Sequence, residues 1–207
     1  MFGPLKSLLF LAVLWLPLSF FVWFYFAQFF VWPISSMSLA VLQTWVPTVF
    51  AEVEQTGRLL TFVTTLPVMQ DGRAGVALIE VDPMIYGYSI PVLVGLVMAT
   101  PLRARQRLWQ IGFGGFMLTL VQTFGTVFDV LKNVGLRMGE VGAAAVADAG
   151  ISMDLIAFCY QFGYLVLPAI TPVILWVAFN QAFIRSLVTI EGSELPDVGT
   201  SDPDRQS

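Results

Sequence analysis

Residues 58–107 read RLLTFVTTLPVMQDGRAGVALIEVDPMIYGYSIPVLVGLVMATPLRARQR, and this stretch decides the fold. Its first part, residues 58–81, holds two runs rich in β-branched and apolar residues, separated by a segment with the turn dipeptide Asp71-Gly72. That pattern predicts a β-hairpin. The next part, residues 84–102, is apolar and predicts a membrane span. Its end is marked by three arginines, Arg103, Arg105 and Arg107. Because basic residues favour the cytoplasmic end of a span, this order predicts a β-hairpin on the outer face of a membrane.

The composition of the whole chain also indicates a membrane protein. Of its 207 residues, 57% are hydrophobic and 12% are charged, whereas a soluble domain has about 25% charged residues. The length suits one bundle of about four spans without a second folded domain. The net charge of −4 argues against a nucleic-acid partner.

Three further apolar stretches predict spans at about residues 8–32, 108–130 and 153–184. The last would be about 48 Å long if straight, longer than the hydrocarbon core of about 30 Å, so we expect a bend at Pro168 and Pro172. Residues 34–50 are apolar but carry several polar side chains and are short for a span. If they crossed the membrane, the three arginines would face outward. We therefore expect an outer helix that is interfacial or re-entrant, with a spanning helix as the alternative.

Together these segments predict an all-α membrane bundle with about four transmembrane helices, an outer interfacial helix and a small extramembrane β-hairpin. Residues 1–190 form a single polytopic membrane domain, and residues 191–207 form a disordered acidic tail in the cytoplasm. Both termini are then cytoplasmic, and the hairpin faces outward. The predicted location is a bacterial inner membrane, with membrane lipid around the spans.

The sequence argues against the common forms of side-chain catalysis. It contains no histidine, so no imidazole is available as a base or as a metal ligand. Its one cysteine, Cys159, lacks a histidine to generate a thiolate and is expected to be an apolar filler. Asp82, Asp129 and Asp154 all map to the outer face, where two of them could form an aspartic dyad. Capping and solvation at span ends explain them more simply. No catalytic residue, metal or cofactor is predicted.

A polar group at the outer ends of the spans is the candidate binding site. Asp129 and Lys132 are three residues apart, so they share one helical face and can pair. Ionisable residues near a membrane boundary are often functional, although a structural ion pair is the simpler explanation. Tyrosines and a glutamine on neighbouring spans could line a groove beside this pair, or form an ordinary aromatic belt. The candidate partner- or peptide-binding residues are Tyr86, Tyr88, Asp129, Lys132, Tyr160 and Gln161.

The layout resembles that of exosortases and archaeosortases, which have an outer β segment, a span, a basic turn, a return span and then a polar patch. The stretch EVDPMIYGYSIPVLVGLV (residues 80–97) occupies the place of the family's catalytic cysteine but contains no cysteine. The stretch TVFDVLKN (residues 126–133) occupies the place of the catalytic arginine, with Lys132 the nearby cation. The family's histidine has no counterpart. No catalytic residue can therefore be carried over.

A closer resemblance is to the exosortase H-associated membrane proteins. Four stretches carry it: VEQTGRLLTFVTTL (53–66), LIEVDPMIYGYSIP (78–91), FDVLKN (128–133) and YQFGYLVLPAITPVILW (160–176). The resemblance implies a bacterial inner-membrane accessory protein that works beside an exosortase, an enzyme that recognises C-terminal sorting signals. The exosortase-like layout without its catalytic residues suggests a pseudoenzyme.

We therefore expect a non-catalytic accessory protein of an exosortase-type sorting system. Its expected partners are the exosortase and sorting-signal peptides. A transporter or channel subunit is one alternative, favoured by Pro168 and Pro172 but not by any internal repeat. An intramembrane aspartic peptidase that uses two of the outer acids is the other.

Overall fold

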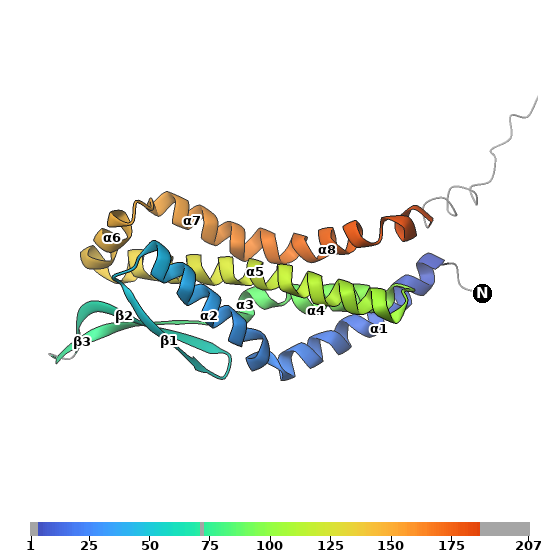
Figure 1. The fold of residues 1–207 in the computed structure, drawn as a ribbon, viewed down its shortest axis with the longest axis horizontal. Coiled ribbons are helices and arrows are strands. Elements are labelled where there is room, and N and C mark those ends of the chain that lie inside the picture. The colour runs from blue at the N-terminus through green and yellow to red at the C-terminus, as the bar shows by residue number, and fades with distance from the viewer. Residues whose placement is uncertain (1–3, 71–72, 187–207) are drawn as a thin grey trace, which may run out of the picture.

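The structure is a computed structural model that describes residues 4–70 and 73–186. The chain begins with two helices, α1 (Pro4–Tyr25) and α2 (Ala27–Trp45), and continues into a sheet of β1 (Phe50–Thr56), β2 (Leu59–Gln70) and β3 (Arg73–Val81). The rest is helical: α3 (Met84–Gly87), α4 (Ser89–Ala99), α5 (Ala104–Arg137), α6 (Gly139–Asp148), α7 (Met153–Gln161), the π-helical turn η1 (Phe162–Val166) and α8 (Leu167–Phe179). The helices form an elongated bundle with the sheet at one end (Figure 1).

Membrane-spanning length is reached by three segments of the described chain: Lys6–Tyr25, Ala104–Arg137 and Met153–Phe179. The segment Met84–Ala99 is apolar but shorter. The sequence predicted a span over residues 84–102. The helix α4 ends earlier, at Ala99, because Thr100 is extended and Pro101 follows it. The mostly helical class, with segments long and apolar enough to span a membrane, is thus confirmed, whereas the number of four spans is not.

The first predicted span, residues 8–32, is wrong in its bounds. The helix α1 ends at Tyr25, and the chain changes direction at Phe26 before α2 begins. The reason lies in α2, whose buried residues recur at helical spacing from Ala27 through Val31, Ile34 and Ser38 to Leu42. This face packs against α5 and β1, so the chain has to turn away from α1. No charge or glycine marks the break in the sequence.

The predicted outer helix, residues 34–50, is also wrong in its bounds. Its helical part begins earlier, at Ala27, and ends at Trp45. Pro47 follows in a turn, and Phe50 already belongs to β1. The last residues of the predicted helix therefore carry the chain into the sheet.

The predicted hairpin, residues 58–81, is present but is part of a three-stranded antiparallel sheet in the order β1-β2-β3. The added strand, β1, has the polar sequence FAEVEQT, which hid it from a search for apolar runs. In addition, β2 continues through Pro67, where a turn was expected, because the pairing shifts register between Val63 and Pro67. The predicted turn residues Asp71 and Gly72 lie outside the described residues, as does the predicted tail at 191–207.

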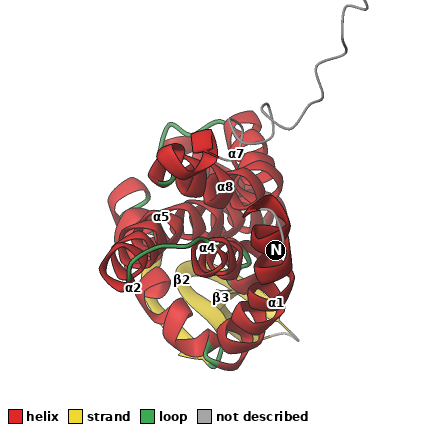
Figure 2. Ribbon diagram, turned by 90° about the vertical axis from the view of Figure 1, so that its right-hand side faces the viewer, coloured by secondary structure: helices red, strands yellow, loops and turns green. Residues whose placement is uncertain are grey.

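The third predicted span, residues 108–130, corresponds to α5, which is longer at both ends and changes character along its length. In its first half the buried residues recur at every fourth position: Gln110, Gly114, Leu118 and Gln122. From Gln122 to Val134 almost every side chain is buried. Here α2, the sheet, α6 and α7 surround the helix (Figures 1 and 2). The extension past residue 130 is therefore stabilised by packing on all sides.

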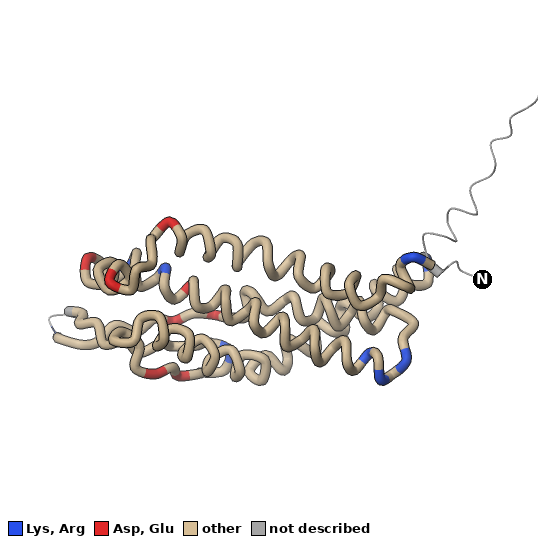
Figure 3. The backbone as a smooth tube through the Cα atoms, turned by 45° about the horizontal axis from the view of Figure 1, so that its top comes forward, with Lys and Arg blue, Asp and Glu red and all other residues tan. Residues whose placement is uncertain are grey.

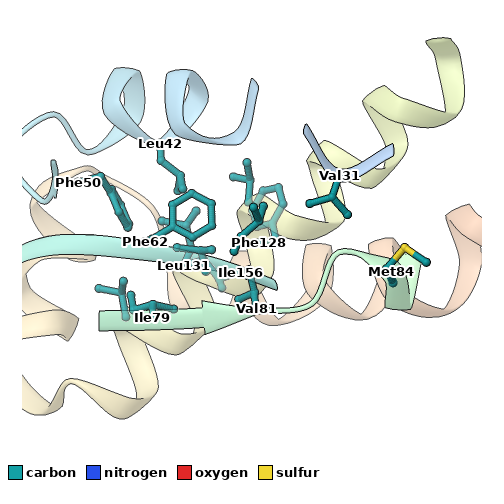
Figure 4. Close-up of a cluster of buried hydrophobic side chains, with 14 of the residues drawn as sticks. Val31, Leu42, Phe50, Phe62, Ile79, Val81, Met84, Phe128, Leu131 and Ile156 are labelled. Carbon is teal, nitrogen blue, oxygen red and sulfur yellow. The ribbon is translucent and has the colours of Figure 1, made fainter. Parts of the chain in front are cut away.

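A hydrophobic core lies between the sheet and the helices α2 and α5 (Figure 4). Phe62 of β2 points into it with Phe50 at 6.4 Å between ring centroids, and Leu42, Phe128 and Leu131 close it from α2 and α5 (Figure 4). Because these side chains are almost completely buried, the sheet is held against the bundle rather than projecting from it as a free hairpin.

The last predicted span, residues 153–184, is confirmed as helical from Met153, with an interruption at Asn180. The expected irregularity lies one turn before Pro168: at η1, where the Leu167 N–H donates to the carbonyl of Phe162, five residues back. Pro168 has no N–H for the carbonyl of Tyr164, so a π turn at this place is a normal consequence of the proline. At the far end, Asn180 and Gln110 exchange two amide hydrogen bonds of 3.0 and 3.1 Å, which fasten α5 to this segment.

Candidate partner-binding site

The candidate site is built on α5, where Asp129 and Lys132 form an ion pair. The Lys132 Nζ lies 2.7 Å from Asp129 Oδ1. The side chain of Lys132 is 22% exposed and that of Asp129 is 12% exposed. Asn133, one turn after Asp129, donates its amide to the Asp129 backbone carbonyl at 2.9 Å and to Oδ1 at 3.3 Å. The carboxylate is therefore fixed by two neighbours on its own helix.

Aromatic residues of α7 and η1 cover the ammonium group. Lys132 Nζ lies 3.6 Å from the centre of the Tyr160 ring, a cation–π contact. The Tyr160 ring stacks on Tyr164, one turn further along, with ring centres 6.0 Å apart and planes 4° from parallel. Through this contact the C-terminal helices are attached to α5 at the level of the ion pair.

The third side of the site is Tyr86 from α3. Tyr86 is 1% exposed, its side chain lies beside the Asp129 carboxylate, and its ring meets Tyr164 edge to face at 6.1 Å. The ring fits because α5 has a glycine here: a Cβ on Gly125 would lie 2.8 Å from Tyr86 Cδ1. We call the five residues Tyr86, Asp129, Lys132, Asn133 and Tyr160 the Asp129 cluster.

The structure thus brings together four of the six predicted residues. Tyr88 is half-buried between α3 and α4, and Gln161 is exposed at the end of α7. Within the described chain, neither makes a hydrogen bond or ring contact with the cluster. Sequence reasoning missed Asn133, although its position four residues after Asp129 on a helix was a usable signal.

The other candidate groups for chemistry lie apart from this cluster. Asp82 pairs with Arg58 at 3.3 Å and accepts a hydrogen bond from the Met84 N–H at 3.0 Å, so it caps α3. Asp154 is exposed in the first turn of α7, which Ser152 caps through the Leu155 N–H at 3.2 Å. Cys159 is half-buried on α7. In the described residues, no three His, Cys, Asp or Glu side chains come together as metal ligands.

The cluster lies toward the sheet end of the bundle, opposite the basic end. Arg103, Arg105 and Arg107 gather where α4 turns into α5, and most acidic residues of the described chain lie toward the sheet end (Figure 3). The Asp129–Lys132 pair is therefore an internally balanced charge pair in the half of α5 that is surrounded on all sides.

Comparison with known proteins places the chain in a family. A search of curated proteins and a search of solved structures gave no significant match. A family model described as exosortase H-associated membrane protein matches residues 3–183, which is most of the chain. This match confirms the resemblance read from the stretches that contain Tyr86, Asp129, Lys132 and Tyr160. The chain therefore belongs to the exosortase H-associated membrane proteins.

Proposed function

We propose that the chain is a non-catalytic membrane subunit that binds an exosortase and contributes to the recognition of its sorting signals. The family name describes its members as membrane proteins associated with exosortase H. The non-catalytic part of the proposal rests on the Asp129 cluster, whose charged and polar groups bind one another. Its cation is bound to the Asp129 carboxylate and to the Tyr160 ring, and that carboxylate also accepts a hydrogen bond from the Asn133 amide.

A hydrolase or transpeptidase needs a nucleophile that a neighbouring group activates. In the described chain, Cys159 is a free thiol that pairs with no carboxylate or cation, and the whole sequence has no histidine. The carboxylates of Asp82 and Asp129 each pair with a separate cation rather than with each other. A shared-proton dyad needs two facing carboxylates, so these pairs favour a structural role.

The proposal includes an orientation in a bacterial inner membrane. The basic turn before α5 would face the cytoplasm, and the sheet with Glu52, Glu54 and Glu80 would face outward. The segment Met84–Ala99 would serve as a fourth, short span, since it extends for about 24 Å at 1.5 Å per residue. A partner enzyme in the same membrane would then meet the Asp129 cluster near the outer boundary of the bilayer, where Lys132 retains some exposure.

Replacing Cys159 with serine is expected to leave the sorting of signal-bearing proteins unchanged, because the thiol takes no part in the reaction. The measurement is the fraction of a signal-bearing reporter that is cleaved in cells whose only copy of the chain carries Cys159→Ser. Loss of sorting in Cys159→Ser, with normal amounts of the protein, would contradict the non-catalytic assignment.

The same cysteine-free background tests the orientation. Glu54→Cys and Arg105→Cys are each treated with a membrane-impermeant thiol reagent, and only the cysteine at residue 54 should react in intact cells.

A further inference from the structure

The two edges of the sheet differ in how they are protected. Edge strands expose unpaired N–H and C=O groups, which proteins usually block with charges, bulges or covering elements. On the β1 edge all three devices are present: Glu52 and Glu54 bring charge, the register shifts between Phe50 and Glu52, and α2 packs alongside. From α2, the Gln43 amide donates to the carbonyls of Phe50 and Ala51 at 3.3 and 3.1 Å. This edge is closed.

The other edge, β3, is open. Its sequence RAGVALIEV has no proline, and its centre, residues 74–79, is uncharged. Its strand partner is β2, and no described residue outside the sheet makes a backbone hydrogen bond to it. Proteins usually protect an edge of this length, and the centre of β3 carries neither a charge nor a proline that would do so.

One side-chain hydrogen bond identifies the backbone groups that face the open edge. The Thr64 hydroxyl of β2 donates to the Ala77 carbonyl of β3 at 2.8 Å, so this carbonyl points toward β2. Backbone groups of successive residues in a strand point to alternate sides. The register shift between β2 and β3 is caused by extra residues in β2, between Val63 and Pro67. The backbone groups of β3 therefore keep pointing to alternate sides on both sides of Ala77. The neighbours Val76 and Leu78 therefore turn their N–H and C=O groups to the open edge, as do Ala74 and Glu80.

The same part of β3 exposes apolar side chains. Val76 is 49% and Leu78 is 58% exposed, and in the described sheet they are the exposed large hydrophobic residues. Both side chains lie on the face of β3 opposite Ala77, Ile79 and Val81, which are buried. Charges flank this apolar centre, with Arg73 at the outer tip and Glu80 at the end that leads into α3.

We propose that the β3 edge binds an extended segment of another protein, which adds to the sheet as a fourth strand. Extended backbone alone supplies donors and acceptors at the spacing that such an edge requires. The charge pattern defines the segment: an uncharged centre with alternating apolar residues, a basic residue opposite Glu80 and an acidic residue opposite Arg73. In the antiparallel direction that this sheet uses throughout, the basic residue comes first.

The β3 strand of a second copy of the chain cannot be the added fourth strand. The strands run roughly along the axis of the bundle (Figure 1). Two β3 strands paired antiparallel would therefore direct their bundles in opposite directions, which a common membrane forbids. The inference goes beyond the proposed association with an exosortase, because it depends on the sheet edge and is testable on the purified chain alone.

The test uses a synthetic peptide as long as the segment from Arg73 to Glu80, acetylated and amidated, that begins with lysine, alternates threonine and valine, and ends with glutamate. Its binding to the purified full chain in mild detergent is measured by fluorescence anisotropy. Leu78→Pro removes one outward N–H, whereas Leu78→Thr keeps it and loses a comparable apolar contact. Because proline is tolerated at sheet edges where its N–H would face solvent, the sheet should survive. We expect Leu78→Pro to weaken binding roughly tenfold or more and Leu78→Thr to weaken it much less.

A second variant, Val76→Pro, provides the same test if Leu78→Pro fails to fold, which circular dichroism and gel filtration would reveal. Glu80→Lys should weaken binding of the lysine-first peptide and favour a peptide that begins with glutamate. Equal binding by the wild type and by a folded proline variant would overturn the proposal. Absence of peptide binding by the wild type, or dimerisation through β3 in place of peptide binding, would overturn it as well.

Discussion

Asp129→Asn is expected to lower the free energy of unfolding by roughly 2–3 kcal/mol. The amide has almost the same shape as the carboxylate, so the hydrogen bonds from Asn133 can persist. The charge of Lys132, however, loses its partner in a site where the lysine side chain is only 22% exposed. Fully buried pairs lose more when one partner is removed, and exposed pairs lose less. Equilibrium unfolding in detergent micelles, or the thermal midpoint, measures the effect.

Two comparisons separate the ion pair from a general loss of charge. Asp154→Asn removes an exposed acid from the first turn of α7 and is expected to cost only a few tenths of a kcal/mol to about 1 kcal/mol. The double variant Asp129→Asn with Lys132→Met removes both charges and should recover part of the loss. An Asp129→Asn protein as stable as the Asp154→Asn protein would mean that the pair contributes little to the fold.

Gly125→Ala is the second substitution with a large expected effect, a destabilisation of roughly 1–3 kcal/mol. The added Cβ would lie 2.8 Å from the ring of Tyr86, a distance at which one of the two groups must move. The ring has little room, because Tyr86 is almost completely buried and Tyr164 lies against it. Displacement of Tyr86 would also disturb its edge-to-face contact with Tyr164 and its place beside Asp129, so the substitution couples helix packing to the Asp129 cluster.

The matched control for this substitution is Gly115→Ala, ten residues earlier on the same helix. A Cβ at Gly115 meets nothing within 4 Å. Since alanine favours a helix over glycine by up to about 1 kcal/mol, this variant should be neutral or slightly more stable. Thermal midpoints of both variants in the same detergent check the difference. If Gly125→Ala were as stable as Gly115→Ala, the close contact between α5 and Tyr86 would be wrong.

The sequence was informative where one residue type has one physical meaning. The strand pattern around Ala77 and the spacing of Asp129 and Lys132 each led to a feature that the structure contains. The Asp129–Lys132 pair was predictable because residues three apart on a helix share a face whatever the rest of the fold does.

The boundaries depended on contacts between distant segments, and these were not predictable. The break at Phe26 arises because α2 packs against α5 and β1, and the run from Leu8 to Trp32 carries no charge, glycine or proline at this place to signal it. The strand β1 has a polar sequence and exists because β2 supplies its hydrogen bonds. Likewise, Tyr86 reaches Asp129 through the gap at Gly125, which is visible only once the helices are packed.

The most direct test of the account is whether the tagged, full-length chain retains its exosortase when both are extracted together from native membranes in mild detergent. An unrelated polytopic membrane protein with the same tag and expression level is the control. The account predicts that exosortase is recovered with this chain, equally with the wild type and with Cys159→Ser, and not with the control. Recovery of no exosortase above the control, or peptide hydrolysis by the purified chain without a partner, would contradict it.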